Sequence, residues 1–199
     1  MKRVLVPIGA VVLLIGLFTL SPGQAVAQDP QGFIATLGKE AIQVLGPGVS
    51  QQQRIARFRQ LFQRDFDVPG IGQFVLGRYW RTATQDEQQE FLRLFQEYIV
   101  QSYAAQLGEY GGEPFRVLSS RPSGNETVVT SVIDRPSGSR ILVDWYVVER
   151  GGASKISDVY VAGVSMKVTQ RDQFASVIQR NGGRIEALLA MLRQRVAIR

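Results

Sequence analysis

The feature that most constrains the fold is a change in hydrophobic periodicity at Gly111-Gly112. Before this pair, apolar residues recur every three or four positions, which is typical of amphipathic helices. After it, four segments rich in Val, Ile, Tyr and Trp are separated by short turns that contain glycine. These segments span residues 115–121, 126–134, 139–150 and 154–169. Because short turns join antiparallel neighbours, the sequence predicts one antiparallel sheet in this half.

The remaining segments predict helices before and after the sheet. They are expected at residues 29–45, 50–65, 71–77, 84–110, 171–179 and 183–196. Ser50 is suited to cap the second helix, and Thr84-Gln85-Asp86-Glu87 has the form of a capping box that begins the longest one. Several helices packed on a curled antiparallel sheet of about four strands make an α+β domain without a linker.

The third predicted strand shows which face of the sheet is buried. By the alternation of side chains along a strand, one face carries only apolar residues: Ile141, Val143, Trp145 and Val147. The opposite face is mixed, since it includes Asp144. The apolar face must therefore pack against the helices.

The first 27 residues have the layout of a secretory signal. Lys2 and Arg3 precede an apolar run over residues 4–20, and Ala25-Val26-Ala27 follows as a small-residue cleavage site. We expect cleavage of residues 1–27, which leaves residues 28–199 as a single exported domain. The alternative is a retained membrane anchor, because the run has about the minimum length that spans a bilayer.

The net charge of the exported part limits the classes of partner that it is expected to bind. Removing Lys2 and Arg3 from the 23 basic residues leaves 21 against 17 acidic ones, a net charge of +4. The arginines are scattered along the chain, so we expect no nucleic-acid partner. Anionic surfaces, including lipid head groups, remain candidate partners.

The side chains most often used in catalysis are missing. The chain has no His and no Cys, which removes the commonest general base, the usual zinc ligands and the thiol nucleophile. Ser165 lacks the following glycine of a nucleophile elbow. We therefore expect no catalytic residue, no metal and no cofactor, with Asp144 and Asp158 as the candidates if the protein is an enzyme after all. A concave sheet covered by helices instead suggests an apolar ligand, although an ordinary core has the same composition.

Short motifs then recur in the order of one known family. They are Phe66-Asp67, Leu76-Gly77-Arg78-Tyr79-Trp80-Arg81, Glu90-Phe91 with Tyr103, Ile156-Ser157-Asp158-Val159, Gly163-Val164-Ser165 and Arg171-x-x-Phe174. Over nearly the whole exported part, the chain resembles the MlaC family, also called the toluene-tolerance Ttg2 family, of periplasmic phospholipid carriers. It departs from the family at Ser154-Lys155, where a Trp-Lys pair is common. The segment GVSMKVTQRDQFASVI also resembles the HpnM-like branch associated with hopanoid biosynthesis.

The resemblance implies a location and partners. It implies a periplasmic protein that shuttles phospholipid or a related lipid between an outer-membrane lipoprotein–porin complex and an inner-membrane ABC transporter with an MCE-domain partner. No cofactor is implied besides the bound lipid. The alternatives are a carrier of a hopanoid-associated lipid, a non-catalytic envelope assembly protein, and an enzyme that uses Asp144 or Asp158.

Candidate lipid contacts follow from placing the acyl chains between the apolar face of the sheet and the helices. On the sheet they are Val129, Ile141, Val143, Trp145 and Val147, and on the helices they are Val75, Leu76, Tyr79, Tyr103 and Leu107. Core packing predicts the same residues. Arg78 and Arg81 are candidate contacts for the head group, with an ion pair to Asp67 or another acid as the alternative.

Overall fold

The computed structural model describes residues 29–45, 48–107 and 112–197, so the predicted signal segment lies outside the described residues. The helices are α1 (Pro30–Leu45), α2 (Gln51–Asp65), α3 (Val68–Leu76), the 3₁₀ helix η1 (Gly77–Arg81), α4 (Gln85–Leu107), α5 (Met166–Arg180) and α6 (Ile185–Ala197). The strands are β1 (Phe115–Ser123), β2 (Glu126–Asp134), β3 (Arg140–Arg150), β4 (Ala153–Val161) and β5 (Val164–Ser165). Within the described part, no helix is both long and apolar enough to cross a bilayer.

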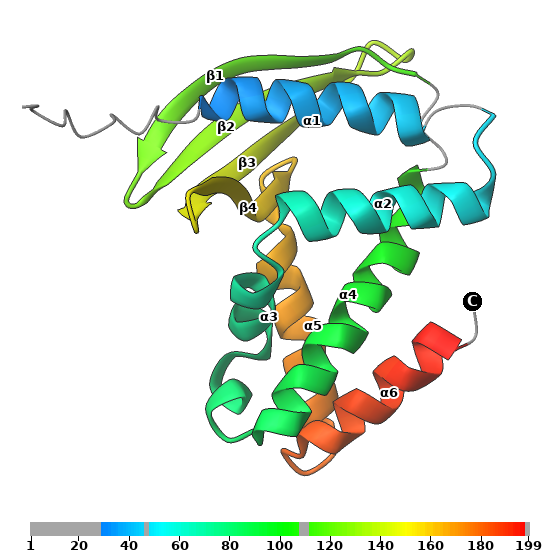
Figure 1. The fold of residues 1–199 in the computed structure, drawn as a ribbon, viewed down its shortest axis with the longest axis vertical. Helices are drawn as coiled ribbons and strands as arrows, with labels where there is room; N and C mark the ends of the chain where they lie inside the picture. Colours follow the sequence, from blue (N-terminus) through cyan, green and yellow to red (C-terminus); the bar gives the residue numbers. More distant parts are fainter. Residues whose placement is uncertain (1–28, 46–47, 108–111, 198–199) are drawn as a thin grey trace, which may run out of the picture.

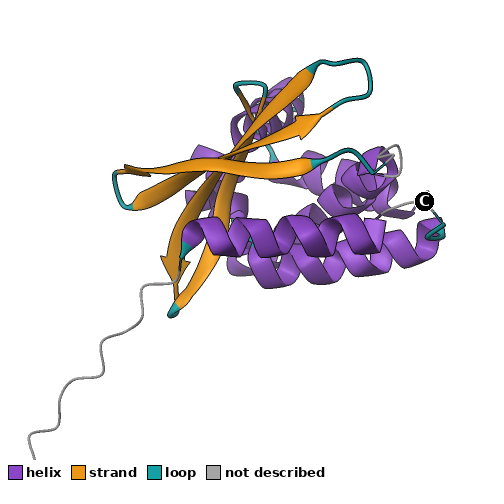
Figure 2. Cartoon of the chain, turned by 90° about the horizontal axis from the view of Figure 1, so that it is seen from above, coloured by secondary structure: helices purple, strands orange, loops and turns teal. Residues whose placement is uncertain are grey.

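The strands form one open antiparallel sheet in the order β1-β2-β3-β4-β5. Figure 1 shows the sheet curving over α1, while α3 to α6 extend away from it beyond α2. Figure 2 shows the marked twist of the strands. The prediction of an α+β domain with a curled antiparallel sheet is thus confirmed, and the fifth strand is the short β5.

Local side-chain contacts set where the early helices begin. Ser50 Oγ accepts from the backbone N–H of Gln53, and the Gln53 side chain accepts from the N–H of Ser50. Thr84 and Glu87 make the equivalent exchange before α4. Both predicted caps are confirmed. In front of α3, the Asp67 carboxylate accepts from the N–H of Gly70.

The apolar interior is divided into two clusters. The sheet cluster packs α1 and one residue of α2 against the sheet, and its buried members are Ile34, Leu37, Leu61, Val129, Val147 and Ile156. The helical cluster joins α2 to α6 around the rings of Phe91, Phe95 and Phe174. Phe66, at the end of α2, packs against both clusters. The chain therefore has two cores that meet near this ring.

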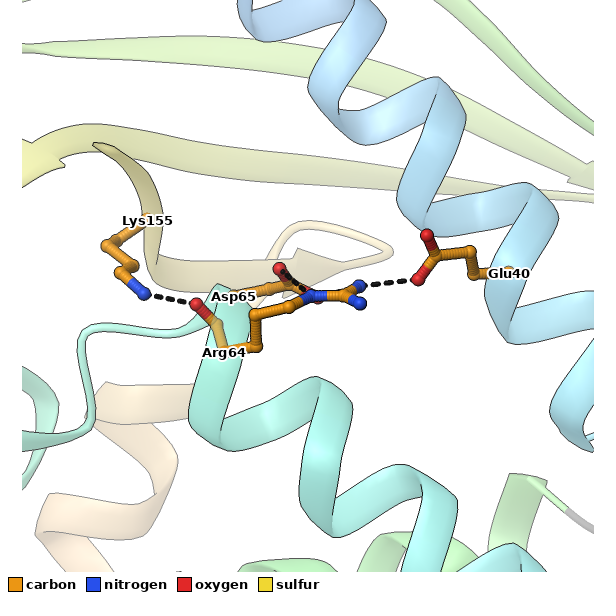
Figure 3. Close-up of polar contacts among 4 residues, drawn as sticks. All are labelled: Glu40, Arg64, Asp65 and Lys155. Atoms are coloured by element: carbon orange, nitrogen blue, oxygen red, sulfur yellow. Dashed lines mark hydrogen bonds and ion pairs between the residues drawn. The ribbon is translucent and has the colours of Figure 1, made fainter. Parts of the chain in front are cut away.

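The junction between the two cores lies at strand β4. Phe66 forms a parallel bridge with Ile156, and the N–H of Asp67 donates to the Ile156 carbonyl at 2.9 Å. Lys155 donates to the backbone carbonyl of Arg64 (Figure 3). The Arg64 guanidinium binds the carboxylate of the neighbouring Asp65, and its ion pair with Glu40 ties α2 to α1 (Figure 3).

Two boundaries differ from the sequence prediction. The fourth strand was expected to reach residue 169, but β4 ends at Val161 and α5 begins at Met166. Ser165 caps α5, because its Oγ accepts from the N–H of Val168 at 3.1 Å. Upstream, α3 begins at Val68, three residues earlier than expected, and η1 follows it. The expected end of the long helix near residue 110 lies outside the described residues.

The closest approach between α1 and the sheet occurs at Gly38. A methyl group at this position would lie 2.3 Å from the Phe115 ring. Ala is favoured over Gly in a helix by about 1 kcal/mol, whereas overpacking a core costs about 1–3 kcal/mol. We expect Gly38→Ala to lower the free energy of unfolding by up to about 2 kcal/mol in urea titrations. Lys39→Ala, at the exposed neighbouring position, is the control, and a Gly38→Ala protein more stable than wild type would contradict the packing described.

A second prediction concerns the link between α4 and α6. Arg193 donates two hydrogen bonds of 2.7 Å to Glu90, and these bonds lower the pKa of the Glu90 carboxyl from its ordinary 4.5. A lowered folded-state pKa stabilises the fold above the ordinary value, and this contribution is lost as the pH falls through the folded-state pKa. We expect Glu90→Gln to lower the free energy of unfolding by less than about 1 kcal/mol at neutral pH, since the pair is partly exposed. The difference should vanish in acid.

A double-mutant cycle checks the origin of this effect. Adding Arg193→Gln to Glu90→Gln should change stability little further at neutral pH, because the first substitution already removes the ion pair. Fully additive effects would show that the two side chains act independently.

Candidate functional site

The apolar face of the sheet is built by cross-strand pairs. Val129 lies opposite Trp145, which lies opposite Val159 on the next strand. The Trp145 ring packs in the sheet cluster and meets the Phe115 ring edge-on, with 6.4 Å between their centroids. Its Nε1–H donates to Ser131 Oγ at 2.8 Å, so the polar atom of the indole has a partner. The predicted orientation of this face is confirmed by the strand register.

This face continues beyond the part that α1 covers. Val143 pairs with Val161, and Val161 pairs with Val164. Their exposed fractions rise along this row, from 5% at Val143 to 36% at Val161 and 53% at Val164. Ile141, at the start of β3, is half-buried. An apolar surface thus emerges from the sheet core toward solvent at the β4–β5 edge.

The end of α4 approaches the same edge. The Tyr103 hydroxyl lies 3.7 Å from the sulfur of Met166, the residue that follows β5. Burial raises the pKa of the Tyr103 hydroxyl. Leu107 is the last residue of α4, and its side chain lies outside the described residues. Of the predicted lipid contacts, Val143 therefore belongs to the row that leads to this edge, and Tyr103 approaches the edge from α4.

The structure separates the other candidate contacts into the two cores. Val129, Trp145 and Val147 belong to the sheet cluster. Val75 and Leu76 are buried in the helical cluster, and Tyr79 is packed against it. The candidates whose side chains the structure describes are therefore divided between different parts of the interior, and the assignment of each one to lipid stays a prediction. Val161 and Val164 were not among the candidates. They are three residues apart, so alternation in the predicted continuous strand would place them on opposite faces, and it is the turn between β4 and β5 that pairs them.

Arg78 and Arg81 lie in η1, at the lower end of the helical part in Figure 1 and away from the sheet. The expected alternative of an ion pair with Asp67 is wrong, because Asp67 accepts from Arg150 at 3.0 Å. The Arg78 guanidinium lies 5.6 Å from the centroid of the Tyr79 ring. Across the described ranges, no carboxylate forms an ion pair with either arginine.

The two acids considered for catalysis make structural hydrogen bonds. Asp158 is 3% exposed, and it accepts from Ser165 Oγ at 2.6 Å. Its other oxygen accepts from the N–H groups of Val159 and Lys167 at 2.8 and 3.1 Å. Asp158 and Ser165 together cap the first turn of α5. Asp144 accepts from Thr130 at 2.6 Å, and its place in the strand puts it on the sheet face opposite the apolar one.

No metal site comes together in the described part of the chain, where no three or more acidic, His or Cys side chains are grouped to hold an ion. Nor does the geometry there present an activated nucleophile. What the site offers is an apolar row of Val143, Val161 and Val164 that leads from the sheet to solvent at the β4–β5 edge. That arrangement suits an apolar ligand rather than a reacting group.

Comparison with known proteins shows one family. The family model described as MlaC protein matches residues 37–194. The toluene tolerance protein ttg2D of Pseudomonas putida is 29% identical over 122 residues, which cover 60% of this chain and 57% of that protein. The intermembrane phospholipid transport system binding protein MlaC of Haemophilus influenzae is 25% identical over 128 residues, covering 62% of this chain and 59% of that protein. The chain thus spans less than two thirds of the length of either relative.

A solved structure has the same fold. It is a phospholipid-binding protein from Ralstonia solanacearum in complex with a phospholipid, with a TM-score of 0.72 and 23% sequence identity. The match covers 85% of this chain and 97% of the other. At this identity the likeness concerns the fold alone.

The Asp158 network yields a stability prediction. Asn at this position cannot reproduce the charged acceptor, so three donors around it lose their best partner. A buried polar group left unsatisfied costs about 1–3 kcal/mol, and we expect Asp158→Asn to lower the free energy of unfolding by about 2–3 kcal/mol. Asp144→Asn, at a half-buried acid with one side-chain partner, is the control and should cost less than about 1 kcal/mol. Equal urea midpoints for the two variants would contradict a specific capping role.

Proposed function

Since this chain belongs to the MlaC family, we propose that it is a periplasmic carrier that binds phospholipid between the apolar face of its sheet and its helices. The observation that carries the proposal is the row Val143, Val161 and Val164, which extends the apolar face to solvent. A few apolar side chains that continue a buried face to the edge of the sheet are the type of lining that apolar ligands favour. An acyl chain laid along this row would cover it.

The energy of lipid transfer explains why a carrier needs such a surface. Exposing one acyl chain of roughly 16 carbons to water costs about 12 kcal/mol, at about 0.8 kcal/mol for each methylene group. A protein that moves lipid through water must therefore cover the chains along their length. The head group can stay hydrated outside, so different heads can be accepted.

In this proposal the chains enter at the β4–β5 edge. Val143, Val161 and Val164 contact them from the sheet, while Tyr103 contacts them from the end of α4. Trp145 and Ile141 lie further along the same face.

The proposal extends to location and partners. Residues 28–199 would be the exported domain after removal of residues 1–27, acting in the periplasm. The chain would shuttle phospholipid between an outer-membrane lipoprotein–porin complex and an inner-membrane ABC transporter with an MCE-domain partner. Support comes from the family and from the name of the Haemophilus influenzae relative as an intermembrane phospholipid transport system binding protein.

Native mass spectrometry of the exported protein tests the carrier function. We expect a mass increase that matches a phospholipid, released by organic extraction and identified by its fragments. A hopanoid-type lipid would be recognised by the same measurement. Absence of bound lipid after purification under gentle conditions would instead favour an envelope assembly protein. In that protein its own side chains would fill the space proposed for lipid.

A matched pair of substitutions tests the position of the chains. Val161→Trp fills the proposed path from an exposed position, and we expect bound lipid to fall several-fold with little change in stability, typically within about 0.5 kcal/mol at such a position. The control is Leu142→Trp, which is 52% exposed and lies on the opposite face of the same sheet. Lipid content that falls equally in both variants, or in neither, would place the chains elsewhere.

A further inference from the structure

A group of four basic side chains lies on η1 and α5, outside the proposed lipid path. We call Arg78, Arg81, Lys167 and Arg171 the basic patch. Lys167 Nζ and Arg171 Cζ lie 4.9 and 4.8 Å from the centroid of the Phe74 ring. A methyl group on Gly77 would meet Arg171 Cδ at 3.7 Å, so the stem of Arg171 reaches the start of η1. The four residues therefore belong to neighbouring turns of two elements, η1 and α5.

The 3₁₀ helix aligns the two remaining members. Residues three apart eclipse one another in this helix, so Arg78 and Arg81 project from the same side of η1. Both are exposed, and Arg78 lies over the Tyr79 ring. Tyr79 and Trp80 are half-buried between them. The patch thus combines exposed cations with partly exposed aromatic rings.

The positive charges of the patch are largely uncompensated. Elsewhere, Arg59, Arg150 and Arg193 each bind a carboxylate at 3.0 Å or less. In the patch, Arg171 has one exposed acid, Asp172, at 3.8 Å. Over the described residues, no ion pair involves the other three members. Lys167 and Arg171 both lie over the Phe74 ring, which carries no net charge. The patch therefore has a positive potential that an anion can neutralise.

We propose that the basic patch docks the protein on the anionic surface of a lipid bilayer. Lysine and arginine near a negatively charged membrane each contribute to binding, and Tyr and Trp favour the interface where lipid head groups lie. A protein partner would call for an apolar centre in the contact. The large hydrophobic side chains that the described residues expose are Leu118, Leu142, Val161 and Val164, and none belongs to α3, η1 or α5.

This inference goes beyond lipid carriage and does not depend on it. Docking through separate point charges is weak and salt-sensitive, so it allows repeated arrival and departure. It also uses a surface other than the β4–β5 edge. A bilayer could therefore be engaged while the proposed lipid path stays unobstructed by the docking residues.

Co-sedimentation with vesicles tests the proposal. The exported protein is mixed with vesicles of phosphatidylcholine alone or of phosphatidylcholine with phosphatidylglycerol. We expect binding to the anionic vesicles at about 0.1 M salt and loss of binding near 1 M, where the Debye length falls from about 10 Å to about 3 Å. Each Lys or Arg contributes about fivefold, so Arg78→Gln with Arg81→Gln should lower the partition coefficient about 25-fold.

The control pair is Arg121→Gln with Arg135→Gln, which removes the same charge from exposed positions in the sheet region. We expect the control pair to change partitioning less than about twofold. Equal losses in the two pairs, or no preference for anionic vesicles in wild type, would overturn the proposal. So would capture of the patch by an acidic protein without vesicle binding.

Bound lipid, measured in the same variants, separates this inference from the carrier function. We expect the patch variants to keep their lipid while losing vesicle binding. A fall in bound lipid after Arg78→Gln and Arg81→Gln would assign the arginines to a carried head group and would overturn the docking role. Folding of every variant is checked by its melting curve.

Discussion

The helical part of this protein is attached to the sheet through strand β4. One edge of that strand receives the α2–α3 connection, where Asp67 donates to the carbonyl of Ile156 and Phe66 lies between the two cores. Asp158, two residues further on, holds the first turn of α5 through Ser165. Both attachments satisfy backbone groups that would otherwise be left unpaired inside the protein. α1 packs directly on the sheet, whereas α3 and α5 begin beside these two contacts.

These attachments also account for motifs of the family. Phe66-Asp67 supplies the ring and the backbone donor at one contact, whereas Asp158-Val159 and Gly163-Val164-Ser165 supply the cap at the other. The chemistry of Asp158 and Ser165 therefore needs no catalytic explanation. Asp158 and Ser165 accept hydrogen bonds from backbone N–H groups, and the surface proposed for lipid is apolar. Neither role requires His or Cys, which the chain lacks.

Much of the fold could be predicted because its signals are local. Ser50 and Thr84 lie three residues from the groups that they cap, so the helix starts are readable in sequence. The start of α5 could not be read in this way, since it depends on Asp158, seven residues before its partner Ser165. The segment after Ser165 has apolar residues that also suit a strand. Sequence likewise could not divide the apolar residues between two cores, because Val75 and Val129 have the same character and differ only in what surrounds them.

The candidate site shows the same limit. Strand alternation identified the face that carries Val143 and Trp145, but it could not show where α1 stops covering that face. The exposure of Val161 and Val164 depends on which elements pack over the β4–β5 edge, which is a tertiary property. For Arg78 and Arg81 the sequence offered two partners, and the structure places Arg150 beside Asp67 instead.

The division of the interior into two cores bears on how such a domain can diversify. Substitutions at Val161 and Val164 alter a surface that belongs to neither buried cluster. Selection can therefore widen, narrow or reshape that surface while the aromatic cluster of the helices and the α1–sheet contacts stay intact. In the proposed carrier, binding of a bulkier or more rigid lipid would call for substitutions at these exposed positions, without compensating mutations in either core.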